Sequence, residues 1–376
     1  MNRTLLIEPR EPLIFRDAKP AGAGLSMRSV DWPLPSAVIG AIRSGLGSST
    51  KFDSKTVSDL LLVEQVGPFL AVEETAGSGV WKLAFPAPAD ALLFGKDDGI
   101  EIAGLRPTPV ASGAGTNLPT GIAPLGGARP EKPVPGPTFW TAENTLNWLS
   151  GVPLKTVRSA ELGPAGLKRE SRVHVKISAD TGTADEGMLF TTEGLEFAVS
   201  GGNDADGRRF AAAICSQVRS EAEWPGIEEL APIGGEKRLA LWSNTQLALP
   251  QPPEALKKVR RLRLQLVTPA AFDLGWKPGW LAEQNGGSPP GFPNVRLRLV
   301  GAAVPRPIFH SGWDLTRRAK DAQKATRLLA PAGSVYFFET DADLDARSLW
   351  MRSICDGEQD RRDGFGIVLC GGWEWQ

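Results

Sequence analysis

The sequence predicts an α+β fold made of two domains, each a small antiparallel sheet with helices on one face. Its 376 residues exceed one ordinary domain of about 150 residues and fit two domains or one domain with large insertions. Short strand patterns and short helix patterns occur in both halves, and no fixed short repeat indicates a solenoid or propeller. The order of these patterns is typical of the split β-α-β arrangement of ferredoxin-like folds.

The first elements are a strand, a long polar loop and a helix. The apolar run "RTLLIEP" ends at Pro9 and predicts the first strand. In "DWPLPSAVIGAIRSGLG", at 31–47, prolines precede Ser36, which we expect to cap a helix, and two glycines lie near its end. Strands are expected at 66–74 and at 80–94, and prolines place the second of these at a sheet edge or beyond the pairing.

A Pro/Gly-rich stretch at 104–137 has little periodicity and predicts a long insertion, at about 95–160, that wraps a surface. A short helix pattern, "TFWTAENTLNWLSG", lies within it. Residues 171–202 then predict a hairpin in which valines alternate with basic residues. "DGRRFAAAICSQVRS" at 206–220 reads as a helix, and "PIGGEKRLALW" at 232–242 as a turn followed by a strand. The first domain is therefore expected at 1–245.

The second domain is expected at 246–376. In "RRLRLQLVTP" and "NVRLRLVG", leucines and valines alternate with Arg261, Arg263, Arg296 and Arg298, which predicts two strands with one buried face each. The following segments are predicted, in order, as a tryptophan-bearing loop at 270–293, a basic helix or ordered segment at 314–329, a strand at 332–340, a helix with an acidic start at 341–354, and a last strand at 364–373.

Composition excludes several function classes. The net charge is −1, so nucleic-acid or membrane contact has to come from local patches. Three cysteines lack metal-ligand spacing and are expected as reduced, buried thiols, which favours a cytoplasmic protein. The two histidines cannot build a multi-histidine metal site, and neither a phosphate-binding P-loop nor a G-x-S-x-G elbow is present. We expect no cofactor, no metal and no membrane-spanning segment.

The remaining signals indicate binding rather than catalysis. The four strand arginines would share one sheet face, where they suit phosphate and stacked bases or pair with cross-strand carboxylates. Basic residues on the hairpin form a second cluster, in which His174 is either a ligand or a structural hydrogen-bonding residue. Trp276 and Trp280, with Lys277 between them, form a stacking platform or anchor a long loop. The sequence thus predicts an anion-binding surface suited to RNA.

Several blocks, in order, resemble the repeat-associated mysterious proteins (RAMP superfamily) of CRISPR systems. "LLIEPREPLIFRDAKP" with "WPLPSAVIGAIRSGL" resembles the family's N-terminus, and "SRVHVKISADTGTADEGMLF" is similar to its central block. "PIGGEKRLA", "LVTPAAFDLGWKPGW", "LAPAGSVYFFE" and "GFGIVLCGGW" are similar to later blocks of one family, subunit three of the type III-B (Cmr) effector complex. These blocks span nearly the entire chain.

This resemblance implies two ferredoxin-like (RRM-like) domains and a non-catalytic subunit that grips the 5′ handle of the CRISPR RNA in antiviral defence. It implies docking to the large polymerase-like subunit and to the backbone RAMP subunits. Carried over by position, the RNA-binding residues are Arg16, Lys19, Ser36, Arg43, Arg172, His174, Lys176, Gly364, Phe365 and Gly366.

A CRISPR precursor-RNA endoribonuclease on the same scaffold is the alternative. RNA cleavage by general acid and base catalysis needs side chains that transfer protons at the 2′-hydroxyl and the leaving oxygen. The candidates in this sequence are His174, His310, Lys176 and Tyr336, of which Tyr336 lies in an apolar strand and is expected to be core. This alternative rests mainly on analogy between folds.

Overall fold

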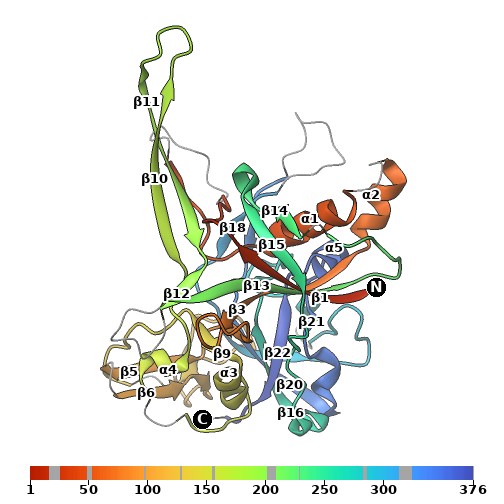
Figure 1. The fold of residues 1–376 in the computed structure, drawn as a ribbon. Helices are drawn as coiled ribbons and strands as arrows, with labels where there is room; N and C mark the ends of the chain where they lie inside the picture. The colour runs from red at the N-terminus through yellow and green to blue at the C-terminus, as the bar shows by residue number, and fades with distance from the viewer. Residues whose placement is uncertain are drawn as a thin grey trace.

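The computed structural model consists of mostly antiparallel sheets with few helices, which confirms the predicted α+β class (Figure 1). It describes residues 1–16, 26–48, 53–96, 99–127, 129–154, 157–200, 209–227, 229–282, 286–312 and 324–375. Within these ranges, no helix is long and apolar enough to cross a membrane.

Two large sheets organise the chain. The strand order in the first is β14 (Leu230–Pro232), β15 (Leu239–Asn244), β1 (Asn2–Pro9), β13 (Arg209–Arg219), β3 (Glu64–Glu73), β4 (Trp81–Pro86) and β9 (Phe139–Thr141), with β12 (Ala198–Ser200) also paired to β13. The order in the second is β17 (Arg298–Ala303), β20 (Val335–Leu344), β16 (Val259–Leu266), β22 (Ile367–Gly372) and β21 (Arg352–Ser353).

Smaller units surround these sheets. The strands are β10 (Lys168–Ile177), β11 (Ala184–Glu196) and β2 (Ser26–Met27) in one unit, and the pairs β18 (Ile308–His310) with β19 (Arg327–Leu329), β5 (Ala91–Lys96) with β6 (Gly99–Gly104), and β7 (Arg106–Pro107) with β8 (Leu125–Gly126). The helices are α1 (Pro35–Leu46), α2 (Ser54–Leu61), α3 (Ala142–Leu149), α4 (Ser159–Leu162) and α5 (Glu358–Arg362), with short 3-10 turns η1 (Gly235–Lys237), η2 (Glu254–Lys257), η3 (Gly279–Leu281) and η4 (Ala346–Leu349).

Several predicted elements are wrong. The single strand expected at 80–94 is two strands in different sheets, and β4 is not at an edge, because it pairs with both β3 and β9. The alanine-rich segment at 206–220 contains β13, because pairing with β1 and β3 on both sides overrides local helix propensity. Helix α1 begins at Pro35 with Leu34 as its N-cap, so Ser36 lies inside the helix and does not cap it. The segment at 341–354 is the end of β20, the short turn η4 and β21, and Asp345 caps η4 by accepting a hydrogen bond from the Arg347 amide.

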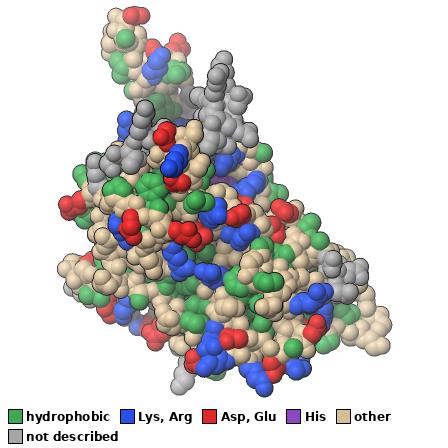
Figure 2. All heavy atoms as spheres, turned by 90° about the vertical axis from the view of Figure 1, so that its right-hand side faces the viewer, with side chains coloured by type: hydrophobic (Ala, Val, Ile, Leu, Met, Phe, Trp, Pro, Cys, Tyr) green, Lys and Arg blue, Asp and Glu red, His purple; other side chains and the backbone are tan. Residues whose placement is uncertain are grey.

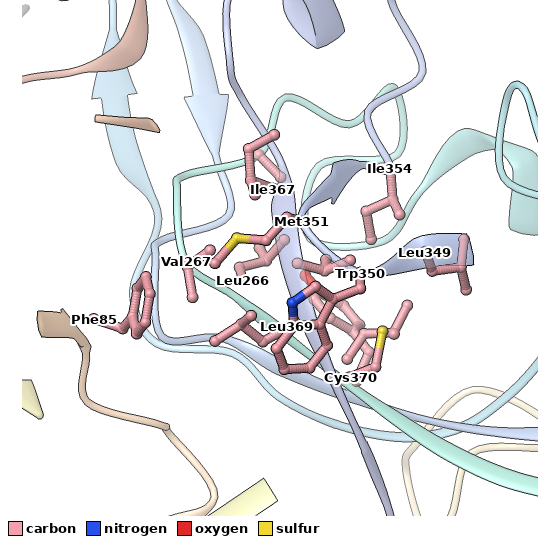
Figure 3. Packing of buried hydrophobic residues seen from close by; sticks show 14 of the residues in the cluster. Phe85, Leu266, Val267, Leu349, Trp350, Met351, Ile354, Ile367, Leu369 and Cys370 are labelled. Carbon is pink, nitrogen blue, oxygen red and sulfur yellow. The ribbon is translucent and has the colours of Figure 1, made fainter. Parts of the chain in front are cut away.

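The two large sheets pack against each other over one shared apolar core (Figure 3). Phe69 of β3 and Phe85 of β4 belong to the same cluster as Leu262 and Leu264 of β16 and Phe338 of β20, and all five are almost fully buried. On the opposite face of the first sheet, a second cluster joins its strands to α1 and α2. Because β1 is buried on both faces, its sequence reads as a continuous apolar run instead of an alternating one.

The arginines of the second sheet pair with carboxylates. Arg261 of β16 and Arg298 of β17 both form ion pairs with Glu339 on the strand between them, β20. Arg263 is 1% exposed, and its Nη1 lies 2.8 Å from Oδ2 of Asp90. These three side chains therefore take the carboxylate-paired alternative, and the buried Arg263 has a structural role.

Asp90 holds a buried polar network between the two sheets. Its Oδ1 accepts a hydrogen bond of 2.8 Å from Nε1 of Trp148 on α3, while Oδ2 accepts from Arg263. Arg263 also donates to the Trp148 carbonyl and lies 5.5 Å from the centre of the Trp148 ring. One carboxylate thus connects the β4–β5 loop, α3 and β16.

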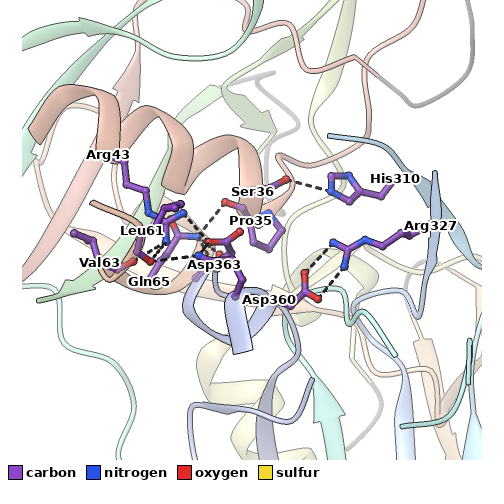
Figure 4. A network of polar contacts seen from close by, with 12 residues as sticks. Pro35, Ser36, Arg43, Leu61, Val63, Gln65, His310, Arg327, Asp360 and Asp363 are labelled. Carbon is purple, nitrogen blue, oxygen red and sulfur yellow. Dashed lines mark hydrogen bonds and ion pairs between the residues drawn. The ribbon is translucent and has the colours of Figure 1, made fainter. Parts of the chain in front are cut away.

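A second polar network joins the N-terminal helix to the C-terminal half (Figure 4). Arg43 of α1 donates to Oδ1 of Asp363 at 2.7 Å and to the Leu61 and Val63 carbonyls. Arg327 of β19 makes a bidentate pair with Asp360 of α5, both bonds 2.8 Å long. These contacts fix the position of α1 relative to α5 and β19.

The turn at 364–366 is packed inside the molecule. A β-carbon on Gly364 would lie 2.5 Å from the Gly67 carbonyl oxygen, and one on Gly366 would lie 2.5 Å from Sγ of Cys355. Both glycines have positive φ, and Phe365 is fully buried. Gly364 therefore permits the close approach of β3 to the C-terminal half, and Gly366 permits the close approach of Cys355.

The cysteine prediction is confirmed, because Cys215, Cys355 and Cys370 are free and buried. Burial raises the pKa of the Cys215 and Cys355 thiols to about 12, so both are protonated and unreactive. Tyr336 is also buried, which raises its pKa, and its hydroxyl donates to the Trp276 carbonyl at 2.6 Å.

We predict that Asp90→Ala lowers the free energy of unfolding by about 3 to 5 kcal/mol, because it leaves the buried Arg263 charge without a partner. Urea unfolding of the isolated chain measures this loss. Glu101→Ala is the control, because it breaks an exposed pair with Arg129 and should cost at most about 1 kcal/mol. Equal losses for the two variants would contradict the assigned role of Asp90.

We predict that His310 makes stability fall as the pH drops below about 6.5. His310 is buried, and burial with the nearby Arg327 and Lys324 lowers its pKa to about 4, although Asp360 and Asp363 oppose the shift. The unfolded chain, whose histidine has its ordinary pKa, therefore takes up the proton first between these two values. Urea unfolding at pH 7.5 and 4.5 should show a smaller loss for His310→Gln than for the wild type; an equal loss would refute the assignment.

Candidate nucleic-acid interface

A pocket of about 300 Å³ lies at the N-terminus of α1. Its walls come from both halves of the chain: the segment after β1, the start of α1, the turn before η1, and strand β18. The lining residues are Ile14, Phe15, Arg16, Val30, Leu34, Ser36, Ala37, Gly234, Gly235, Phe309, His310 and Ser311. The pocket is thus mostly apolar, with a few polar groups that converge on it.

Ser36 and His310 contact each other in the lining of this pocket (Figure 4). The Ser36 hydroxyl oxygen lies 3.5 Å from Nε2 of His310, and the His310 ring packs on Phe365 with centroids 5.5 Å apart. With a pKa of about 4, His310 is neutral at physiological pH. A neutral imidazole has one donor and one acceptor nitrogen, which suits recognition of a polar edge of a ligand.

Arg16 and Phe309 give the pocket a charged and an aromatic rim. Arg16 is exposed and pairs with Ser29 through an isolated β-bridge, while the Phe309 ring is 52% exposed. Gly234 has φ of 79°, and a β-carbon there would lie 2.7 Å from the Ile14 carbonyl oxygen. The turn can therefore close the pocket only with glycine at this position. A flat base with an adjacent phosphate fits this combination of groups.

Strands β10 and β11 form a two-stranded arm that projects from the body (Figure 1). The predicted alternation is confirmed, because Arg172, His174 and Lys176 occupy one face of β10 and the apolar residues the other. The apolar face, however, is exposed in the isolated chain. Its members are Val173 at 65%, Val175 at 43%, Ile177 at 56% and Leu189 at 61% exposure.

The polar face of the arm carries paired charges and a stacked ring pair. Arg172 Nε donates to Glu170 at 2.5 Å, and Lys176 Nζ lies 2.7 Å from Asp185. The Glu170 carboxylate raises the pKa of Arg172. Nε2 of His174 lies 2.9 Å from the Thr192 hydroxyl, and its ring stacks on Phe190 with centroids 5.0 Å apart.

The base of the arm is tied to the segment that leads into the pocket. Leu195 of β11 bridges to Leu13, and β2 pairs in parallel with β11. Arg169 of β10 forms ion pairs with Asp31 and Glu193 and donates to the Ser29 carbonyl. The arm and the pocket are therefore joined through residues 13–16 and 26–31.

The ten predicted site residues separate into four groups. Arg16 and Ser36 meet at the pocket, while Arg172, His174 and Lys176 lie on the arm. Arg43 has a structural role, because its side chain and that of Asp363 are each only 11% exposed in their ion pair. The turn at 364–366 is packed inside the molecule, so Gly364, Phe365 and Gly366 also have structural roles. Lys19 lies outside the described residues, as does most of the predicted basic segment at 314–329.

Sequence reasoning missed Phe309 and Gly234 as pocket residues and considered His310 only as a nuclease candidate. The pocket is built from segments about 270 residues apart, such as Ser36 and His310, and no local pattern links them. The available signal was the glycine pair in "PIGGEKR", because paired glycines often permit a close backbone approach.

The tryptophan loop takes a mainly structural role. Trp280 stacks on Phe338 with centroids 6.0 Å apart, and its Nε1 donates to the Ile354 carbonyl at 2.9 Å. Trp276 is 38% exposed. Among the residues that the structure describes, no group of three or more His, Cys, Asp or Glu side chains is placed to hold a metal ion.

Comparison with curated proteins finds no match. A chain of the type III-B Cmr-beta complex bound to cognate target RNA and AMPPnP, solved by cryo-EM, is 14% identical, with 89% of this chain and 86% of that chain covered and a TM-score of 0.48. The same complex bound to target RNA alone gives the same identity and coverage and a TM-score of 0.46. A chain of the Csm3-Csm4 subcomplex of the type III-A interference complex is 8% identical, with 90% and 93% covered and a TM-score of 0.33.

The family comparison is decisive. Residues 5–373 match the model of the family described as CRISPR-associated protein (Cas_Cmr3), which covers nearly the whole chain and confirms the resemblance found in the sequence motifs. The chain therefore belongs to the Cas_Cmr3 family of type III-B CRISPR proteins.

Proposed function

We propose that this chain is the non-catalytic subunit of a type III-B effector complex that grips the 5′ handle of the CRISPR RNA. One observation carries the proposal: Arg16, Ser36, His310 and Phe309 meet at one pocket, which is joined to the base of a projecting arm. Sequence-specific RNA recognition mostly uses unstacked single-stranded bases, which fit into such pockets. An unpaired handle is a ligand of this kind.

Each pocket group has a role that follows from its chemistry. Phe309 offers an exposed ring on which a base stacks, and the Ser36 hydroxyl and neutral His310 read the polar edge of that base. Arg16 at the rim contacts the adjacent phosphate. The pocket is therefore the specific part of the grip.

The arm supplies contacts along the RNA backbone. Arg172 and Lys176 are paired with acids at the surface, and exposed pairs are worth only about 0 to 1 kcal/mol, so phosphates can replace the carboxylates. The exposed valine face packs against bases or a partner subunit once the complex forms. On the face seen in Figure 2, basic and acidic side chains are interspersed, which agrees with local contacts in place of one large basic field.

The fold and the cellular context belong to the same proposal. In each large sheet, four strands have the order fourth, first, third, second: β15, β1, β13, β3 in one and β22, β16, β20, β17 in the other. This order supports two ferredoxin-like units, at 1–245 and 246–376, in which most helices are reduced to short turns. We propose that the subunit acts in the cytoplasm in antiviral defence and docks to the large polymerase-like subunit and the backbone subunits.

We predict that complexes reconstituted with this chain assemble about tenfold less well on guides whose 5′ handle is scrambled. In the same assay, the logarithm of the affinity of the complex for guide RNA is plotted against the logarithm of the salt concentration. Arg16→Ala and Arg172→Ala should each make this slope shallower by about 0.7 to 1, because each substitution removes one phosphate contact. Arg129→Ala, which removes an exposed arginine of the insertion, serves as the control. Equal assembly on guide RNAs with scrambled and with native 5′ handles would contradict the proposal.

We predict no cleavage of repeat RNA by the purified chain. The side chain of His174 contacts the Thr192 hydroxyl and stacks on Phe190, and Tyr336 is buried. The pKa of His310 is about 4, which is far from the value near 7 that favours general acid and base catalysis. Gel analysis of labelled repeat RNA tests this. Cleavage that His174→Ala or His310→Ala abolishes would establish the endoribonuclease alternative instead.

A further inference from the structure

A second, larger groove is lined by residues of α3 and of the C-terminal end of the chain. Figure 1 shows both of these elements at the end of the molecule opposite the arm. The volume of the groove is about 650 Å³, within the range of ligand-binding sites. The end of α3, the turn η2 and the last residues of β22 border it. It shares no lining residue with the pocket at α1.

The lining of the groove combines polar and apolar surface in similar amounts. Leu149, Leu256 and Cys370 lie almost fully buried beneath it, while Val259 and Trp375 are half-buried. Trp375 stands edge-on to the buried Trp373 ring, with centroids 5.2 Å apart. An extended polypeptide, which has a polar backbone and can present apolar side chains, fits a lining of this kind.

One charge in the groove is uncompensated. Arg106 lines it, and among the residues that the structure describes its guanidinium forms no ion pair or hydrogen bond. The neighbouring Arg263 is already matched by Asp90, and the charge of Arg106 contributes to lowering the Arg263 pKa, after the larger effect of burial. An incoming carboxylate would satisfy Arg106.

The charge count of the groove favours a polypeptide over RNA. Its lining holds one cation, Arg106, and one carboxylate, Glu374, whose side chain is 81% exposed and pairs with Arg261. Surfaces that hold single-stranded nucleic acid combine several cations with stacking rings. A polypeptide segment with one acidic group matches this mixed lining and its single unpaired arginine.

We propose that this groove binds an extended polypeptide segment of a partner subunit, and that an acidic side chain or the C-terminal carboxylate of this segment pairs with Arg106. The segment is held by apolar contact along the groove and by one charge-assisted bond at its end. This site goes beyond the RNA grip and does not depend on it, because the two surfaces are separate.

Gly372 gives a clean way to block the groove. It lines the groove, and a β-carbon built on it would have no heavy atom within 4 Å, so a larger side chain enters open space without disturbing the fold. Gly115 is equally open but lies outside the groove. Gly372→Leu and Gly115→Leu are therefore a matched pair. Arg106→Glu and the exposed Arg352→Glu on β21 form a second pair.

The experiment reconstitutes the effector complex from its purified remaining subunits, guide RNA and each variant of this chain. Size-exclusion chromatography measures incorporation, and thermal unfolding of each variant checks its fold. We expect Gly372→Leu and Arg106→Glu to reduce incorporation about tenfold or more, while both control variants assemble normally. Should Arg106→Glu not fold, Gly372→Leu decides the question.

Photo-crosslinking identifies the occupant. A benzophenone amino acid replaces Ser150, which is exposed at the groove beside α3, and mass spectrometry maps the product. We expect a peptide of a partner subunit that carries Asp, Glu or the C-terminus near the crosslink. Crosslinks to the RNA alone, no crosslink in the assembled complex, or normal incorporation of Gly372→Leu would each overturn the proposal. Binding to the 5′ handle, measured in parallel, reports separately on the RNA grip.

Discussion

The contact between the two large sheets is the constraint on which the rest of the molecule depends. Phe69 and Phe85 of the first sheet pack with Leu262, Leu264 and Phe338 of the second, and this shared core fixes how the two halves face each other. Only in this arrangement does the start of α1 meet β18, so that Ser36 and His310 line one pocket. A loss of packing between the sheets would therefore remove the pocket as well as stability.

Burial decides which charged residues serve structure and which serve binding. Arg43 and Arg263 lie where the two halves meet and are matched by Asp363 and Asp90, because an unmatched charge there would be costly. Arg172 and Lys176 lie on the arm, where their exposed pairs with acids are weak and replaceable. The proposed RNA grip is therefore compatible with a nearly neutral chain, since it needs only a few basic residues to reach the phosphates.

The molecule separates its two binding surfaces. The pocket and arm lie at one end and combine aromatic, neutral polar and basic groups, which together suit RNA. The groove lies at the other end and combines a mixed polar and apolar lining with a single unpaired arginine, which suits a polypeptide. If both proposals hold, this separation lets the chain bind RNA and a partner at the same time without competition between the two.

The sequence by itself determined the α+β class, the family and the elements whose period is local, such as β1, the β10–β11 hairpin and the alternating β16. It did not reveal β13, because a strand paired on both sides and buried on both faces has no alternation, and its alanines favour a helix. Of the predicted site residues, it correctly placed the basic face of the hairpin. Tertiary structure alone decided that Arg43, Arg263 and the 364–366 turn are buried and that Arg16, Ser36 and His310 share a pocket, because burial and contact between distant segments depend on how the two sheets pack.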